Sequence, residues 1–216
     1  MKKIFIPQIE ALDASNIENA ELLLEQLGKR DMIETNNWKE QYPYKPITSF
    51  TMAYNTQGIF VKYDVRGTML KAVFTTDQEP VHKDSCVEFF CQLPNSATYS
   101  NFEFNCIGTC QASKRESRTE NVVPYDAADM QRIIRFPSIG RRPFMELKGH
   151  FEWSLTVFIP FDLIGIVGEA KSQTLRANFY KCADDTESVH YLSWSPIKTE
   201  NPDFHRPEHF GEIVFE

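Results

Sequence analysis

The segment CVEFFCQLP (residues 86–94) changes character at every step, and this period of two predicts a β-strand. Alternate side chains of a strand point to opposite faces of its sheet. One face of this strand is wholly apolar and consists of Val87, Phe89, Cys91 and Leu93. The other face is mixed and carries the carboxylate of Glu88. Glu88 is therefore expected on the second face of a sheet rather than in its core.

The same period recurs along most of the chain. Further strands are predicted at residues 4–7, 49–55, 58–67, 100–108, 130–136, 150–160, 174–182 and 211–216. Short turns rich in Asn, Gly, Pro and Asp separate them, and residues 161–168 are expected to form a helical turn. Many short strands with few helices indicate an antiparallel sandwich or barrel. In the strand at residues 150–160, Trp153 shares the apolar face and is expected in the core.

One helix is expected near the N-terminus, in SNIENAELLLEQLGKR (residues 15–30). Ser15 and Glu18 have capping-box spacing, and apolar residues follow with helical periodicity. Gly28 stands where a C-terminal cap belongs. The chain has no internal repeat, low-complexity tract or flexible linker, so residues 1–216 are predicted to form a single domain.

Composition narrows the range of partners. The 216 residues carry a net charge of -7, and basic residues occur only in short, interrupted clusters, which argues against a nucleic-acid partner. No apolar run approaches the roughly 18 residues of a membrane span. The N-terminal IFIP (residues 4–7) is too short for the apolar part of a signal peptide. We therefore expect either a cytoplasmic protein or the processed form of a periplasmic or secreted one.

The cysteines and histidines show no familiar metal-binding spacing. The five cysteines are Cys86, Cys91, Cys106, Cys110 and Cys182, an odd number that rules out complete pairing within the chain. They are predicted to be buried free thiols. His205 and His209 lie four residues apart, but Pro202 and Pro207 make a regular helix there unfavourable. A metal site at that pair is an open alternative.

Three predicted strands have faces that would supply convergent hydrogen-bonding groups for a polar, neutral ligand. These groups belong to Glu88, to Glu103 and Asn105, and to Arg176, Asn178 and Tyr180. An ordinary solvent-exposed face of an antiparallel sheet is the alternative interpretation. Trp194 precedes a proline-broken loop that holds Phe204 and His205. Such an aromatic side chain either stacks on a sugar ring or closes one end of the sandwich.

Familiar catalytic motifs are absent: no nucleophile elbow, phosphate-binding loop, zinc-protease motif or dinucleotide fingerprint occurs. Glycoside hydrolysis requires two carboxyl groups that flank the scissile bond. Glu88 and Glu103 could supply such a pair, although carboxylates also bind sugar hydroxyls without any chemistry. A glycoside hydrolase is therefore retained as an alternative.

Five ordered motifs carry a resemblance to a known family. They are DSCVEFF (84–90), FEFNCIG (102–108), WSLTVFIPF (153–161), LRANFYK (175–181), and SWSP (193–196) followed by DFHRPEHFGEIVF (203–215). With them the chain resembles the family 9 carbohydrate-binding modules, and more closely the family-9-like proteins of gut Bacteroidetes. The resemblance implies a β-sandwich of antiparallel sheets that binds sugars. It also implies structural calcium and association with glycoside hydrolases such as xylanases.

The family site holds a sugar ring between two tryptophans, beside a carboxylate and Arg or Asn side chains. By resemblance, the carboxylate is Glu88, and the polar residues of the next strand are Glu103 and Asn105. Val81, His82 and Lys83 occupy the place of the first tryptophan, so His82 is its candidate. The second tryptophan corresponds to Trp194 or is replaced by Phe204 or His205. Asp184 and Asp185 are the candidate calcium ligands.

The sequence and the resemblance together predict an all-β fold, an antiparallel β-sandwich of immunoglobulin-like or jelly-roll-like type with one N-terminal helix and short helical turns. The expected function is non-catalytic binding of plant or host polysaccharide fragments, of xylan or cellulose type, during glycan utilisation. Alternatives are the glycoside hydrolase, a sandwich that binds haem or another small ligand, and a module that binds a protein through its N-terminal helix.

Overall fold

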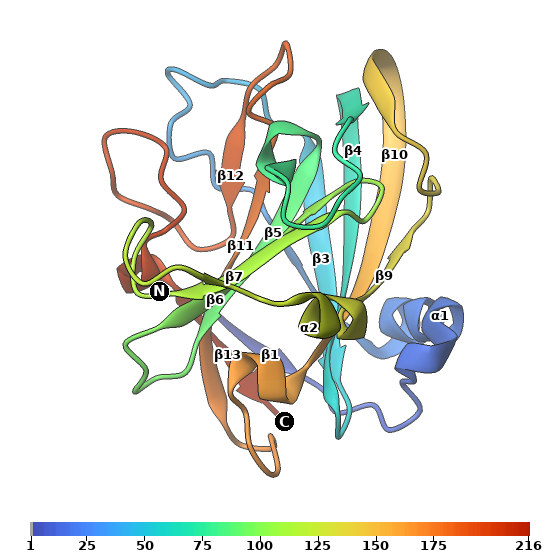
Figure 1. The fold of residues 1–216 in the computed structure, drawn as a ribbon, viewed down its shortest axis with the longest axis vertical. Helices are drawn as coiled ribbons and strands as arrows, with labels where there is room; N and C mark the ends of the chain where they lie inside the picture. Colours follow the sequence, from blue (N-terminus) through green and yellow to red (C-terminus); the bar gives the residue numbers. More distant parts are fainter. Residues whose placement is uncertain (1) are drawn as a thin grey trace.

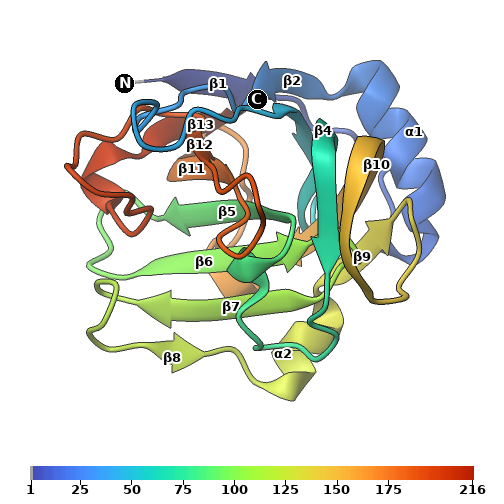
Figure 2. The ribbon, with the colours of Figure 1, turned by 90° about the horizontal axis from the view of Figure 1, so that it is seen from above.

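The computed structural model describes residues 2–216, which form two packed β-sheets (Figures 1 and 2). The large sheet has the strand order β1 (Lys3–Ile6), β13 (Gly211–Phe215), β11 (Thr174–Cys182), β5 (Cys86–Gln92), β6 (Tyr99–Asn105), β7 (Cys110–Arg115) and β8 (Val123–Pro124), with β12 (Tyr191–Ser193) also paired to β11. The small sheet has the order β2 (Lys29–Met32), β3 (Ile47–Tyr54), β4 (Gly58–Ala72), β10 (Phe144–Pro160) and β9 (Ile134–Pro137). The predicted β-sandwich is confirmed.

One strand pair departs from the antiparallel rule. Strands β1 and β13 run parallel, with Lys3 opposite Glu212 and Ile6 opposite Phe215. Just after β1, an isolated parallel bridge joins Gln8 to Tyr54 of the small sheet. The N-terminal segment therefore hydrogen-bonds to both sheets along one side of the sandwich.

Apolar strand faces meet between the sheets and form the main core. Phe50 of β3 stacks on Phe179 of β11 with ring centroids 3.8 Å apart, and Phe89 of β5 lies 5.0 Å from the same ring. Trp153 belongs to this core, as predicted. Each large apolar side chain buried here contributes ~1.5–3 kcal/mol relative to an exposed one.

The expected helix is present, but its N-terminal cap lies one residue later than predicted. Helix α1 (Ile17–Leu27) lies outside the small sheet, where Ala20 and Leu24 are buried (Figure 2). Asn16 caps it by accepting a hydrogen bond from the backbone N–H of Asn19, whereas Ser15 belongs to a preceding 3-10 turn. Gly28 ends the helix as expected. Any other residue would clash at this position, because its Cβ atom would lie only 2.6 Å from the Leu24 carbonyl oxygen.

Residues 130–136 are not a continuous strand, so that prediction is wrong in its first half. Helix α2 (Ala127–Arg132) occupies the segment up to Arg132, and β9 begins only at Ile134. The side chain of Asp126 caps α2 by accepting hydrogen bonds from two backbone N–H groups of its first turn. This local cap outweighs the alternating pattern. Residues 161–164 form the expected helical turn, and no helix described in residues 2–216 is long and apolar enough to cross a membrane.

The outer face of the large sheet is covered rather than open to solvent. We call residues 36–46 and 194–210 the covering loops. The indole N–H of Trp38 donates to the Thr199 carbonyl at 2.9 Å, which ties the two loops together. Apolar side chains of both loops pack on Phe90 and Tyr180 of the sheet in a second hydrophobic cluster. The second face of β5, which the sequence assigns to Glu88, therefore lies under a further layer.

Candidate functional site

A pocket of about 240 Å³ opens on the outer face of the large sheet, beside the covering loops. Its lining comes from five strands (β5, β6, β7, β11 and β12), the 3-10 turn at Val81–Lys83 and the loops that follow β7, β11 and β12. The lining residues are His82, Glu88, Glu103, Gln111, Arg115, Arg118, Cys182, Asp184, Tyr191, Pro202, Asp203, Phe204 and His205. The strand register brings the residues of the pocket floor side by side. Glu88 of β5 lies opposite Glu103 of β6, and Glu103 lies opposite Gln111 of β7.

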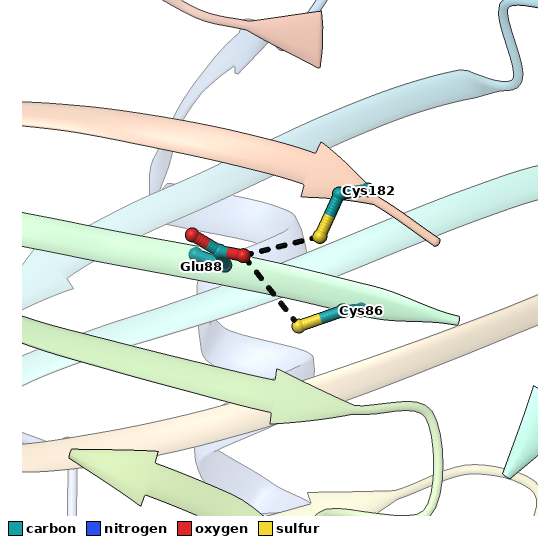
Figure 3. Close-up of side chains that lie close together, drawn as sticks. All are labelled: Cys86, Glu88 and Cys182. Carbon is teal, nitrogen blue, oxygen red and sulfur yellow. Dashed lines mark hydrogen bonds between the residues drawn. The ribbon is translucent and has the colours of Figure 1, made fainter. Parts of the chain in front are cut away.

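Glu88 lies at the bottom of this pocket with only 2% of its surface exposed. Two thiols point at its carboxyl oxygen Oε1, as Figure 3 shows: Cys182 Sγ at 3.1 Å and Cys86 Sγ at 3.8 Å. Burial raises the pKa of Glu88 well above its usual value, and the neighbouring carboxylate of Glu103 raises it further. Both effects favour the protonated, neutral form of the Glu88 carboxyl group.

Glu103 and His82 form a polar pair at the pocket wall. The Glu103 carboxylate accepts a hydrogen bond from Asn101 Nδ2 at 2.9 Å through Oε1, and Oε2 lies 3.7 Å from His82 Nδ1. The nearby Glu103 carboxyl group raises the pKa of His82 against the opposing effect of burial. The Glu103 side chain therefore favours the charged form of His82.

Asp184 supplies a third carboxyl group. Within residues 2–216 its buried oxygen Oδ1 has no hydrogen-bond partner, and burial raises its pKa. The backbone N–H of Asp184 donates to the carbonyl of His82 at 3.0 Å, which fixes the turn after β11 against the 3-10 turn. An unpaired buried carboxyl oxygen is energetically unfavourable, so a ligand hydroxyl that reached it would be stabilised.

Aromatic side chains close the pocket on the loop side. Phe204 stacks on Tyr180 with centroids 4.1 Å apart, and the Tyr180 hydroxyl donates to the Phe204 carbonyl. His205 Nδ1 lies 2.9 Å from the Tyr99 hydroxyl. Burial lowers the pKa of His205 to about 3, so its ring is neutral at ordinary pH. Tyr191 adds a further ring to the lining.

A family model described as "Carbohydrate-binding family 9" matches residues 18–215. The chain belongs to carbohydrate-binding family 9. The resemblance inferred from the sequence motifs is thereby confirmed, and it extends through the N-terminal helix, which the motifs do not reach.

Solved structures place this family 9 chain among similar folds. A protein from Bacteroides uniformis ATCC 8492, provisionally described as carbohydrate-binding, aligns with a TM-score of 0.91 and 32% identity over 100% of this chain and 99% of that one. A family 9 module from Caldicellulosiruptor kristjanssonii in complex with glucose aligns at 0.59 and 11% identity, over 100% and 96% of the two chains. A family 9 module from the same organism in complex with cellotriose aligns with a TM-score of 0.59 and 10% identity, over 100% of this chain and 94% of that one. These two likenesses show the fold alone. None of the curated proteins matches this chain.

The pocket of the family 9 chain brings together five of the ten candidate ligand-binding residues. They are His82, Glu88, Glu103, Phe204 and His205. Tyr180 lies directly behind the lining, because its ring supports Phe204.

The other four candidates lie outside the pocket and hold the fold. Asn105 is fully buried and donates to Asp84 Oδ2 and the Phe74 carbonyl, and Arg176 donates to Gln92 Oε1 at 2.7 Å. Asn178 is bonded to both backbone groups of Ser195. Trp194 has no exposed surface, and its indole N–H donates to Asp31 Oδ2 at 2.7 Å. In this family 9 chain, Trp194 is thus a core side chain that presents no ring face to a ligand.

Sequence reasoning missed several lining residues. Gln111 and Arg115 lie on β7, which the sequence did not reveal as a strand because its CQASKR segment is largely polar. Arg118 belongs to KRESR (114–118), one of the short, interrupted basic clusters, which gave no signal for a ligand site. Tyr191 had no signal of its own, and Asp184 was noted only as a calcium candidate. Knowledge of the register β5–β6–β7 would have revealed Gln111, because Glu103 pairs with it.

The candidate metal ligands have different surroundings. Asp185 accepts a hydrogen bond from the Lys71 ammonium group at 2.7 Å, so a cation already faces it, and the Asp184–Asp185 pair does not fit calcium. His205 is bonded to Tyr99, and His209 Nε2 instead accepts from the Lys198 backbone, so these rings do not converge. The five cysteines are buried free thiols, as predicted. Within residues 2–216, the ligand atoms of Cys86, Glu88 and Cys182 do converge.

Proposed function

We propose that this protein binds carbohydrate without hydrolysing it, and that the sugar occupies the pocket beside Glu103 and Asp184. Membership in carbohydrate-binding family 9 supports the proposal. The similar structure from Bacteroides uniformis is provisionally described as a carbohydrate-binding protein. The family 9 modules from Caldicellulosiruptor kristjanssonii were solved with glucose and with cellotriose. Association with a glycoside hydrolase, which the resemblance implies, belongs to the same proposal.

We assign the sugar to this pocket because several hydrogen-bonding side chains converge on it. Glu103 and Asp184 offer acceptors, while Gln111 and Arg118 offer donors. Sugar hydroxyl groups both donate and accept, so a wall of mixed character suits them. The orphaned Oδ1 of Asp184 supplies an acceptor that other residues do not already use.

The size of the pocket supports a short ligand. Its volume of about 240 Å³ lies just below the ~300–1,000 Å³ range of sites for drug-sized molecules. We therefore expect one sugar ring to enter, as the end of a glucan or xylan fragment. Tyr191 and Phe204 would contact the apolar face of that ring, although Tyr180 already covers one face of Phe204.

Calorimetric titration tests the proposal with glucose, cellotriose, xylose, xylotriose and host-glycan fragments. We expect binding to at least one of these sugars. Asp184→Asn should weaken it roughly 10–100-fold, because a hydrogen bond to a charged acceptor contributes ~1.5–3 kcal/mol. Asp185→Asn is the matched control: its carboxylate is exposed and bonded to Lys71, so its affinity should equal that of the parent. Absence of binding to every sugar, or equal loss in both variants, would contradict the proposal.

Glycoside hydrolysis is the second candidate, favoured by one observation. Glu88 and Glu103 are cross-strand partners, and both line the pocket. Incubation with xylan and cellulose fragments, followed by a reducing-sugar assay, distinguishes the two functions. Release that disappears in Glu88→Gln would establish the hydrolase, whereas binding without release supports the non-catalytic proposal.

A further inference from the structure

Two thiols and one carboxyl group meet at the floor of the pocket. Cys86 and Glu88 are two residues apart on β5, so their side chains share a face, and Cys182 lies directly opposite Cys86 on β11. All three are buried, and one ligand atom from each lies within 4.8 Å of the others (Figure 3). Two rigid, paired strands therefore hold this cluster in place.

The spacing of these atoms matches a tetrahedral metal site. Zinc–sulfur bonds of ~2.3 Å and zinc–oxygen bonds of ~2.0–2.2 Å separate a sulfur from an oxygen ligand by roughly 3.5 Å and two sulfur ligands by about 3.8 Å. The two sulfur–oxygen distances of 3.1 Å and 3.8 Å fall on either side of the first value. Only small side-chain shifts would thus be needed to enclose an ion.

We propose that Cys86, Glu88 and Cys182 form a binding site for a borderline-soft divalent metal ion, with zinc as its preferred ion. Thiolate ligands favour zinc over hard cations such as calcium and magnesium, which prefer oxygen. The site is therefore different in chemistry and in residues from the calcium site that the family resemblance implies. It is also independent of the proposed sugar binding, since zinc affinity is measured without saccharide.

The metal has three protein ligands and one remaining position. Glu88 and Cys182 both line the pocket, so that position faces its interior, where water or an oxygen of a pocket ligand completes the tetrahedron. Three protein ligands with an open fourth position are typical of zinc sites that meet small molecules rather than purely structural ones.

In the metal-free cluster both thiols donate hydrogen bonds to the Glu88 carboxyl group. Burial raises the pKa of the Cys86 thiol to about 12, and it raises the pKa values of Cys182 and Glu88 as well. These shifts favour the protonated forms of all three groups. Binding of the ion replaces these protons and releases them to the solvent. The charged groups around the cluster are His82, Glu103, Lys181 and Asp184.

Cobalt titration of the metal-free, reduced protein tests the site, with zinc then used to displace the cobalt. We expect one cobalt ion per chain with a thiolate-to-cobalt charge-transfer band in the near ultraviolet. Zinc should abolish the band at one equivalent, and calcium should not compete. Cys86→Ala and Glu88→Gln should each weaken zinc binding by about 100-fold or more, since even loss of a group that merely supports a ligand costs 10–100-fold.

Cys91→Ala is the matched control. Cys91 is a buried free thiol on the same strand, but it faces the main core and lies outside the cluster. The Cys91→Ala variant should bind zinc with the same affinity as the parent protein. Circular dichroism verifies folding, and Glu88→Gln, which preserves side-chain shape, decides the question if Cys86→Ala does not fold. A missing charge-transfer band, effective calcium competition, or parental zinc affinity in folded Glu88→Gln would overturn the proposal.

Discussion

At the scale of single residues, the pocket is notable for ionisable side chains whose neutral forms are favoured by burial. Glu88 is buried beneath two thiols, and His205, in the second covering loop, packs against Tyr99 of the sheet. In both cases removal from water disfavours the charged form, which raises the pKa of an acid and lowers that of a base. Such groups make the stability of the fold depend on pH.

His205 gives the clearest prediction of this kind. Its pKa falls from an unfolded value of ~6.5 to about 3 because of burial and the nearby guanidinium groups of Arg115 and Arg118. Between these two values the unfolded chain binds a proton that the folded chain does not. Stability is therefore complete above pH ~6.5 and falls on acidification, by up to ~1.4 kcal/mol per pH unit from this residue.

The measurement is urea unfolding from about pH 7 to about pH 4. His205→Gln should reduce the loss of stability on acidification, because glutamine cannot take up the proton. His150→Gln, at an exposed position on β10, is the control and should keep the parental slope. Equal slopes in the parent and His205→Gln would show that the buried ring does not govern acid stability.

At the scale of elements, local chemistry decides where helices begin. The sequence offered Ser15 and Glu18 as a capping box, yet the side chain that accepts a hydrogen bond from the first turn of α1 belongs to Asn16. Asp13 caps the short 3-10 turn before it. Asp13 and Asn16 thus act as two successive caps before the helix. The sequence pattern predicts a cap at Ser15, one residue before the cap of α1.

The corrected cap can be tested by paired substitutions. Asn16→Ala should lower the free energy of unfolding by about 1 kcal/mol, because it leaves a backbone N–H of α1 without its acceptor. Ser15→Ala should cost clearly less, because its side chain bonds only to the exposed Asp13 carboxylate. Chemical denaturation measures both. The opposite order of effects would restore Ser15 as the cap.

Most strands could be predicted from the sequence, but what covers them could not. Alternation along residues 86–94 correctly separates the core face of β5 from the face of Glu88. Whether that second face is open to solvent depends on the covering loops, whose position rests on contacts such as Trp38 with Thr199, 161 residues apart. Local periodicity contains no information about such contacts. The same limit applies to Trp194. Its loop setting left open whether it stacks on a sugar ring or closes one end of the sandwich, and its ring lies in the core.

At the scale of the whole molecule, the pocket depends on a second hydrophobic layer formed by distant parts of the chain. Trp38 from the first covering loop packs against Tyr191 and Phe204, with centroids 6.3 Å and 6.2 Å away. Both partners line the pocket. The wall that faces a ligand is thus supported from behind by a residue that does not line it.

Replacement of Trp38 should therefore affect both stability and binding. Trp38→Leu should lower the free energy of unfolding by about 2–4 kcal/mol and also weaken sugar affinity, since Tyr191 and Phe204 lose their support. Trp153→Leu, in the core between the sheets, should destabilise the fold similarly but leave the affinity of the folded protein unchanged. Chemical denaturation and calorimetric titration measure the two effects. Equal affinities in both variants would contradict the supporting role of Trp38.

The parallel pairing of β1 and β13 has a mechanical consequence. A pulling force that enters through the start of β1 and leaves through the end of β13 acts along these strands in opposite directions. It therefore loads their four register pairs in shear, so the backbone hydrogen bonds share the load instead of opening one by one. Single-molecule extension should therefore show a high, cooperative rupture force.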